Sequence, residues 1–161
     1  MPIVLVRIDD RLVHGQVVQG WIPQLDADEV LVVSRNVQGD EMRKTLMRLS
    51  LPEEIDLKVM APPEAAEYSK TVGKTGPHIL ILAPGPSEVA EMLNAGAVFE
   101  SVNVGGMHYS VGKTQLGKAI FLSGEDIDSL RQIASKGVRL EGRGVPADEA
   151  VDVLDMIERS H

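Results

Sequence analysis

A cluster of charged residues surrounds one histidine directly after the first apolar segment of the chain. The stretch VRIDDRLVHGQ carries Arg7, Asp9, Asp10, Arg11 and His14 and follows the apolar residues IVLV at positions 3–6. A histidine in this setting can act as a general base, bind a metal ion or accept a chemical group as a nucleophile. The other histidines stand at neither HxH nor HExxH spacing, which disfavours a zinc or iron site.

Acceptance of a phosphoryl group fits the neighbours of this histidine. Arginines bind phosphoryl oxygens through paired hydrogen bonds, and Arg7 and Arg11 offer two guanidinium groups. If a helix opens after His14, the backbone N–H groups of Gly15 and Gln16 add an anion site. An aspartate that accepts the N–H of one ring nitrogen would leave the other nitrogen free to attack. The same residues also fit a general base, or a loop histidine beside helix-capping residues, so these readings stay open on the residues alone.

A second cluster is the glycine-rich stretch VNVGGMHYSVGKTQ at residues 102–115. Gly105 and Gly106 would allow a close approach of backbone to another group, and Lys113 adds a cation. The spacing between Gly106 and the GKT sequence is one residue too long for an ATP-binding P-loop. A plain turn fits the stretch equally well, and His108 within it is expected to be a solvated loop residue. Arg35, in the polar segment SRN, is a further candidate neighbour of the site.

Composition excludes several classes of protein. The 161 residues carry 16 Lys and Arg against 24 Asp and Glu, and the net charge of −8 disfavours a nucleic-acid partner. The absence of cysteine removes disulfides, thiolate catalysis and Cys-ligated metals. The apolar runs are far shorter than a membrane span requires, and the N-terminus lacks the features of a signal peptide. We therefore expect a cytoplasmic protein.

Short β-branched runs alternate with segments of helical period along the whole chain. We expect strands at residues 2–8, 29–33, 56–60, 78–82 and 99–104, with weaker ones at 119–122 and 138–142. We expect helices at residues 13–24, 40–49, 63–71, 87–94, 123–136 and 148–159, and a mobile connection at 142–146. This alternation predicts one α/β domain over residues 1–161, with an open, mostly parallel sheet of six or seven strands and helices on both faces.

The predicted fold explains why the charged cluster deserves a functional interpretation. In open parallel sheets, ligands bind beyond the carboxyl ends of the strands. The segments that follow the expected strands there include residues 9–14, 34–39 and 105–113. The histidine cluster is the first of these segments, and Arg35 and the glycine-rich stretch belong to two others.

The chain resembles a known family at these motifs and over nearly its whole length. It is similar to the IIB component of the mannose/fructose/sorbose family of the bacterial phosphoenolpyruvate-dependent sugar phosphotransferase system (PTS). The matching motifs are RIDDRLVHGQ at 7–16, Asp40 with RKTL at 43–46, VNVGGM at 102–107 and GKTQ at 112–115. The first of them is highly specific, and the others support it.

The resemblance implies a role for each residue of the first cluster. His14 would take a phosphoryl group on Nδ1 from a phosphohistidine of the IIA component and pass it to a sugar imported by the membrane components IIC and IID. Arg11 would steady the phosphoryl group and Asp9 would orient the ring. Asp10 and Gln16, together with Arg7 and Gly15, would support the loop and the phosphate. No metal or nucleotide takes part in this step in the family, so no cofactor is expected.

Four questions stay open after this resemblance. A regulatory protein of the same fold, which reports its phosphorylation state without serving transport, would carry the same motif. The sugar is selected mainly by the membrane components, and self-association through Trp21 or the helix at 40–49 is left open. The family commonly carries an acidic residue where this chain has Arg35, which puts the specificity for the IIA partner in doubt.

Overall fold

The structure is a computed structural model that describes residues 2–72 and 75–160. Its strands are β1 (Ile3–Asp9), β2 (Glu29–Val33), β3 (Asp56–Met60), β4 (Ile79–Ala83), β5 (Ser101–Gly106), β6 (Thr114–Gly117), β7 (Ile120–Leu122), β8 (Arg139–Gly142) and β9 (Val151–Asp152). Its helical elements are the π-helical turn η1 (Val17–Trp21), α1 (Ile22–Leu25), α2 (Arg35–Gln38), α3 (Glu41–Ser50), α4 (Pro62–Thr71), α5 (Pro86–Asn94), α6 (Gly124–Ser135) and α7 (Val153–Arg159).

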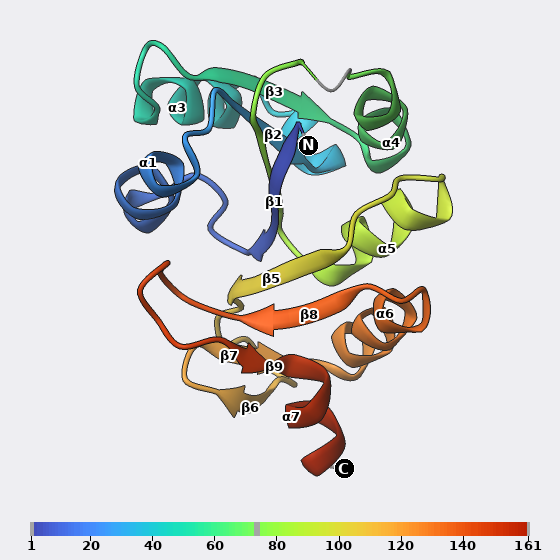
Figure 1. The fold of residues 1–161 in the computed structure, drawn as a ribbon. Helices are drawn as coiled ribbons and strands as arrows, with labels where there is room; N and C mark the ends of the chain where they lie inside the picture. Colours follow the sequence, from blue (N-terminus) through green and yellow to red (C-terminus); the bar gives the residue numbers. More distant parts are fainter. Residues whose placement is uncertain (1, 73–74, 161) are drawn as a thin grey trace.

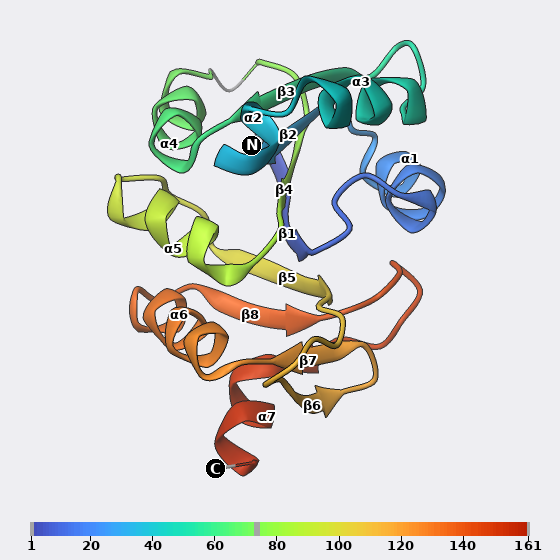
Figure 2. The ribbon, with the colours of Figure 1, turned by 180° about the vertical axis from the view of Figure 1, so that it is seen from behind.

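Seven strands form one sheet in the order β3-β2-β4-β1-β5-β8-β9, and β6 pairs with β7 in a separate hairpin. All pairs of the large sheet are parallel except the last, where β9 runs antiparallel to β8. The helices α4, α5 and α6 lie along one side of the sheet, and α1 and α3 lie on the other (Figures 1 and 2). The predicted α/β fold with a mostly parallel sheet is confirmed.

Alternation of side chains along the central strands divides the apolar residues into two cores. Along β4, Ile79 and Ile81 belong to the core under α4, α5 and α6, whereas Leu80 and Leu82 belong to the core under η1 and α3. Burial on both faces explains why these strands are continuous apolar runs. In β1 the same alternation turns Arg7 toward the second core, between Val6 and Ile8 of the first.

Two predicted helices differ from the structure. The helix expected at 13–24 contains the π-helical turn η1, where the N–H of Ile22 bonds to Val17; Pro23 follows and has no N–H to continue regular α-helical bonding. The helix expected at 148–159 begins only at Val153, because Asp152 is its N-cap and accepts a hydrogen bond from the N–H of Asp155.

The glycine-rich segment also differs from the prediction. The weak strand expected at 119–122 is β7, but it pairs with β6 in a hairpin and does not join the large sheet as a paired strand. Strand β5 continues through Gly105 and Gly106, which were expected to lie in the following loop. The carboxyl ends of β1, β5 and β8 therefore lie side by side, as the pairing of Asp9 with Gly106 and of Val104 with Gly142 shows.

Candidate functional site

His14 is held by Asp9, the last residue of β1. Its Nε2 atom lies 2.7 Å from Oδ2 of Asp9, and the other carboxylate oxygen accepts the backbone N–H of Arg11 at 3.1 Å. The carboxylate of Asp9 is fully buried, whereas the imidazole keeps 13% of its surface exposed. With Nε2 donating to Asp9, Nδ1 carries the lone pair of the neutral ring. The predicted orienting contact between Asp9 and His14 is therefore present, and it turns Nε2 toward the carboxylate.

The loop between β1 and the first helix contains a residue in an uncommon conformation. Leu12 has a φ of +57°, in the left-handed region that non-glycine residues rarely occupy. Its side chain is buried in the second core, and its N–H bonds to the carbonyl of Asp9 at 3.0 Å. Such a conformation costs about 1–2 kcal/mol and persists only where the surroundings fix it. Burial of Leu12 thus fixes the turn that brings His14 back to Asp9.

Arg7 is the fully buried cation that holds Asp9 in place. One of its terminal nitrogens donates to Oδ1 of Asn103 and to the carbonyl of Arg143, at 2.5 and 2.8 Å. The other donates to Oδ2 of Asp9 and to the carbonyl of Gly144, at 3.1 and 3.0 Å. Burial lowers the pKa of Arg7, and the charge of Asp9 opposes that shift. All four terminal N–H groups are in use, so Arg7 supports the loop and is not placed to grip a phosphoryl group.

Gly105 and Gly106 are needed because side chains of β1 occupy the space beside them. A Cβ atom on Gly105 would lie 2.1 Å from Cζ of Arg7. A Cβ atom on Gly106 would lie 3.2 Å from Oδ1 of Asp9 and from Cε1 of His108. Gly105 therefore leaves the space that the guanidinium group fills, and the expected close approach at this pair of glycines is present in the structure.

Asp10 joins the loop of His14 to the end of β5. Its carboxylate accepts the backbone N–H of His108 at 2.6 Å and contacts Nδ1 of the same residue at 2.6 Å. The backbone N–H of Asp10 donates to the carbonyl of Gly106 at 2.9 Å. His108 is exposed, as expected, but it is tied to the loop of His14 through this aspartate.

The segment after β8 belongs to the site, although the sequence was interpreted there as a mobile connection. The carbonyl of Gly144 accepts the indole N–H of Trp21 at 3.0 Å as well as the N–H of Arg7. The indole ring lies 5.1 Å from Cζ of Arg7. The sequence did contain a signal for this segment, because residues 143–146 follow the carboxyl end of a strand, as His14 does.

Two of the predicted neighbours lie apart from this arrangement. Arg35 forms a paired hydrogen bond with the carboxylate of Glu91 on α5, at 2.9 and 2.7 Å, and this contact raises the pKa of Arg35 and lowers that of Glu91. Lys113 lies 3.8 Å from Oδ2 of Asp126 on α6. Neither cation lines the pocket beside His14, and each has a carboxylate partner elsewhere.

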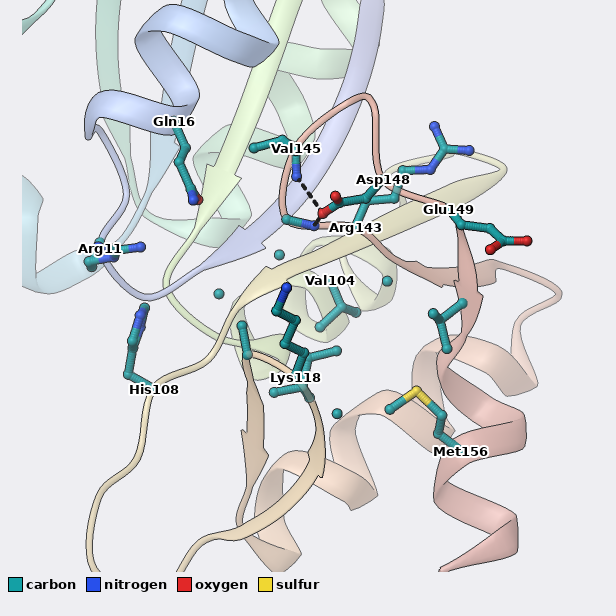
Figure 3. Close-up of a pocket in the computed structure, with 18 residues that line it drawn as sticks. Arg11, Gln16, Val104, His108, Lys118, Arg143, Val145, Asp148, Glu149 and Met156 are labelled. Carbon is teal, nitrogen blue, oxygen red and sulfur yellow. Dashed lines mark hydrogen bonds between the residues drawn. The ribbon is translucent and has the colours of Figure 1, made fainter.

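A pocket of about 840 Å³ opens beside the loop of His14. Arg11 and Gln16, which flank His14 in sequence, line it together with Gly105, Gly106 and His108. Figure 3 shows that the rest of the pocket lining comes from the β6–β7 hairpin and from the segment between β8 and α7. Gly15 is exposed, and no heavy atom lies within 4 Å of a Cβ placed on it, so no close contact requires a glycine there.

The described residues contain no group of three or more His, Cys, Asp or Glu side chains that could hold a metal ion. Within residues 2–72 and 75–160, no helix is long and apolar enough to cross a membrane.

Comparison with known proteins identifies the family. A family model described as "PTS system sorbose subfamily IIB component" matches residues 3–161. The chain is 34% identical over 158 residues to the sorbose-specific EIIB component of Lacticaseibacillus casei, covering 98% of this chain and 96% of that protein. It is 33% identical over 159 residues to the mannose-specific EIIAB component of Escherichia coli (strain K12), covering 99% of this chain and 49% of that longer protein.

A solved structure agrees with this assignment. The crystal structure of the IIBSor domain of the sorbose permease from Klebsiella pneumoniae superposes with a TM-score of 0.93 at 34% identity, and the match covers 100% of this chain and 99% of that one. The chain therefore belongs to the IIB components of the mannose/fructose/sorbose family of the sugar phosphotransferase system.

Proposed function

We propose that this IIB component carries a phosphoryl group on Nδ1 of His14. The observation that supports the proposal most directly is the contact of 2.7 Å between Nε2 of His14 and the buried carboxylate of Asp9. A carboxylate on one ring nitrogen fixes the tautomer and makes the other nitrogen the nucleophile. It also stabilises the positive charge that the ring gains once Nδ1 bonds to phosphorus.

The transfer consists of two displacements at phosphorus. In the first, Nδ1 of His14 forms a bond to the phosphoryl group as the phosphorus–nitrogen bond of a phosphohistidine on the IIA component breaks. In the second, a hydroxyl oxygen of the sugar bonds to phosphorus, the bond to Nδ1 breaks and the hydroxyl proton leaves to water. Phosphoryl transfer depends mainly on positioning and charge stabilisation, which makes the placement of His14 decisive.

Arg11 is the cation that we assign to the phosphoryl oxygens. Its side chain is exposed and lines the pocket beside His14, whereas the guanidinium group of Arg7 is already engaged with protein acceptors. Gln16, also exposed on the pocket wall, adds an uncharged donor. Arg7 would then act through Asp9 by holding the carboxylate against the ring, and Asp10 would act by joining the loop to β5.

The partners follow from the same proposal. We expect the donor to be a phosphorylated IIA component, because the relative from Escherichia coli is named as an EIIAB component, a single chain in which A and B parts are joined. We expect the acceptor sugar to be held by the IIC and IID membrane components, so that transfer takes place on the cytoplasmic side. The pair formed by Arg35 and Glu91 lies exposed near the carboxyl end of β2 and would modify the IIA contact.

A labelling experiment tests the assignment. Incubation with phosphorylated IIA component should give an acid-labile phosphohistidine on the wild-type chain and none on His14→Ala. His78→Ala is a matched control, because His78 is exposed at the amino end of β4 and contacts the carbonyl of Asp26. Labelling that persists in His14→Ala, or that disappears in His78→Ala, would contradict the proposal.

A further inference from the structure

The pocket beside His14 extends well beyond the residues that the proposed transfer uses. Its volume of about 840 Å³ lies in the range of small-molecule sites, about 300–1,000 Å³. His14 itself does not form part of its wall; the wall continues from Arg11 and Gln16 across the ends of β5 and β8 to the hairpin of β6 and β7. This space can therefore hold a small molecule next to the phosphorylated position.

One wall of the pocket gathers hydrogen-bond donors and positive charge on a chain whose net charge is −8. Figure 3 shows Lys118, in the turn between β6 and β7, with its ammonium group directed toward the end of β5, and Gln16 with its amide directed into the same space. Arg11 and His108 lie on the same side of the pocket. Positive charge with amide donors is the chemistry that recognises a phosphate.

The nearest carboxylates are held by protein donors and form no ion pair with Lys118 or Arg11 among the described residues. Asp10 accepts the backbone N–H and contacts the ring of His108. Asp148, which also lines the pocket, accepts the backbone N–H groups of Gly144 and Val145 at 3.1 Å each. Figure 3 shows the side chain of Glu149 directed away from Lys118. An anion bound by Lys118 and Arg11 would therefore not have to displace a carboxylate from either cation.

The remaining wall is apolar. Val104, Ile120, Val151 and Met156 line the pocket beyond the donor wall. Pockets that bind small molecules commonly combine such apolar surface with a few polar groups that fix the orientation. A sugar ring presents C–H groups on its faces, so this surface can pack against a ring whose phosphate lies at the donor wall.

We propose that this pocket binds a sugar phosphate, with Lys118, Arg11 and Gln16 around the phosphate and the apolar wall against the sugar. The proposal rests on the proposed function for the ligand class, because a sugar phosphate is the product of that transfer. Bound there, the product would occupy the space next to His14 and oppose a further cycle of phosphoryl transfer.

Titration of the ¹⁵N-labelled full chain tests the site. We expect mannose 6-phosphate or fructose 1-phosphate, at millimolar concentration, to shift resonances of Lys118, Gln16 and residues 142–146 in a saturable manner. Unphosphorylated mannose and fructose should bind much more weakly. The absence of saturable shifts with both sugar phosphates would overturn the proposal, and equal affinity for inorganic phosphate would overturn the assignment to a sugar.

Two lysine variants test the role of the donor wall. Lys118→Met should weaken binding about tenfold, as expected for the loss of one charge-assisted hydrogen bond. Lys136→Met is the matched control, since Lys136 is an exposed lysine at the C-cap of α6 and does not line the pocket. An unchanged affinity in Lys118→Met would contradict the site, and Lys118→Arg should restore binding.

Binding of a sugar phosphate and phosphorylation of His14 can be tested independently. Binding of a sugar phosphate to His14→Ala should persist, because the imidazole is not in the pocket wall. Labelling of the wild-type chain by phosphorylated IIA component needs no sugar phosphate. Labelling without binding would overturn the pocket alone, and binding without labelling would overturn the carrier role of His14 alone.

Discussion

Replacement of Gly105 by alanine should destabilise the protein, because the added methyl group would clash with the guanidinium group of Arg7. The added methyl group would lie 2.1, 2.3 and 2.5 Å from Cζ and the two terminal nitrogens of Arg7. Real Cβ atoms do not approach other heavy atoms closer than 3.0 Å, so the guanidinium group or β5 must move. Arg7 cannot yield easily, because it is fully buried and its terminal nitrogens donate to Asn103, Asp9, Arg143 and Gly144.

The magnitude follows from these contacts. Overpacking of a well-packed interior costs about 1–3 kcal/mol, and a lost hydrogen bond to a charged group costs about 1.5–3 kcal/mol. If displacement of Arg7 breaks one of its four bonds, the free energy of unfolding should fall by about 3–5 kcal/mol. This is a large part of the stability of an ordinary domain. Where the displaced guanidinium group moves away from Asp9, phosphorylation of His14 should also slow in the protein that remains folded.

The assay is urea unfolding at pH 7, followed by circular dichroism, with Gly124→Ala as the control. A Cβ atom on Gly124 has no heavy atom within 4 Å, and the residue opens α6. Its replacement should leave the stability unchanged or raise it by up to about 1 kcal/mol. If Gly105→Ala lowers the free energy of unfolding by less than about 1 kcal/mol, the substitution behaves much like one at the surface, and the steric argument is refuted.

A double-mutant cycle isolates the contact itself. Arg7→Lys keeps a cation beside Asp9 but removes the planar fork that fills the space next to Gly105. In the Arg7→Lys background, Gly105→Ala should lower the free energy of unfolding by at least about 1 kcal/mol less than it does in the wild type. If Gly105→Ala lowers the free energy of unfolding equally in the two backgrounds, the methyl group clashes with a group other than Arg7.

Three further substitutions separate chemistry, titration and helix capping. Asp9→Asn should slow single-turnover phosphorylation of His14 about 100-fold or more by removing the charge that orients and stabilises the ring; a rate within threefold of wild type would contradict this role. Burial raises the pKa of Glu88 above its ordinary value of 4.5, so the fold favours the protonated form and its stability falls as the pH rises through the folded pKa. Glu88→Gln should therefore stabilise the protein in urea unfolding at pH 7 and lose that advantage near pH 4, and an advantage independent of pH would refute the cause. Ser123→Ala should cost about 1 kcal/mol, because its Oγ accepts the N–H of Asp126 at 3.1 Å in the capping box that begins α6; no loss in thermal unfolding would contradict it.

The sheet could be predicted because its signals are local. The strands at 29–33 and 56–60 occur at the predicted residues, since apolar β-branched runs between polar segments define them without knowledge of the rest of the chain. The helices that begin at Glu41 and Gly124 were also expected within one residue, because Asp40 and Ser123 are N-caps that bond to the first turn. These elements need only neighbouring residues to form.

The elements that were predicted wrongly lie where two local sequence signals compete. Asp148 and Asp152 are both suitable N-caps for the last helix, and only the structure shows that Asp148 bonds to the turn at Gly144 and Val145. The two residues before Val153 pair with β8 instead of joining the helix. In the same way, the sequence of β7 is compatible with a strand of the large sheet or with a hairpin. Its pairing with β6 in the folded chain selects the hairpin.

The role of Arg7 shows what a motif cannot specify about a site. Arg7 and Arg11 are four residues apart and chemically alike, so the sequence offered both as ligands of a phosphoryl group. Alternation along β1 buries one of them, and the missing Cβ of Gly105, 98 residues later, provides the space for its guanidinium group. The acceptors from Asn103, Arg143 and Gly144 then hold that group against Asp9. Only contacts between β1, β5 and the segment after β8, which are distant in sequence, decide that Arg7 positions the carboxylate, while Arg11 stays exposed at the pocket where a phosphoryl group would lie.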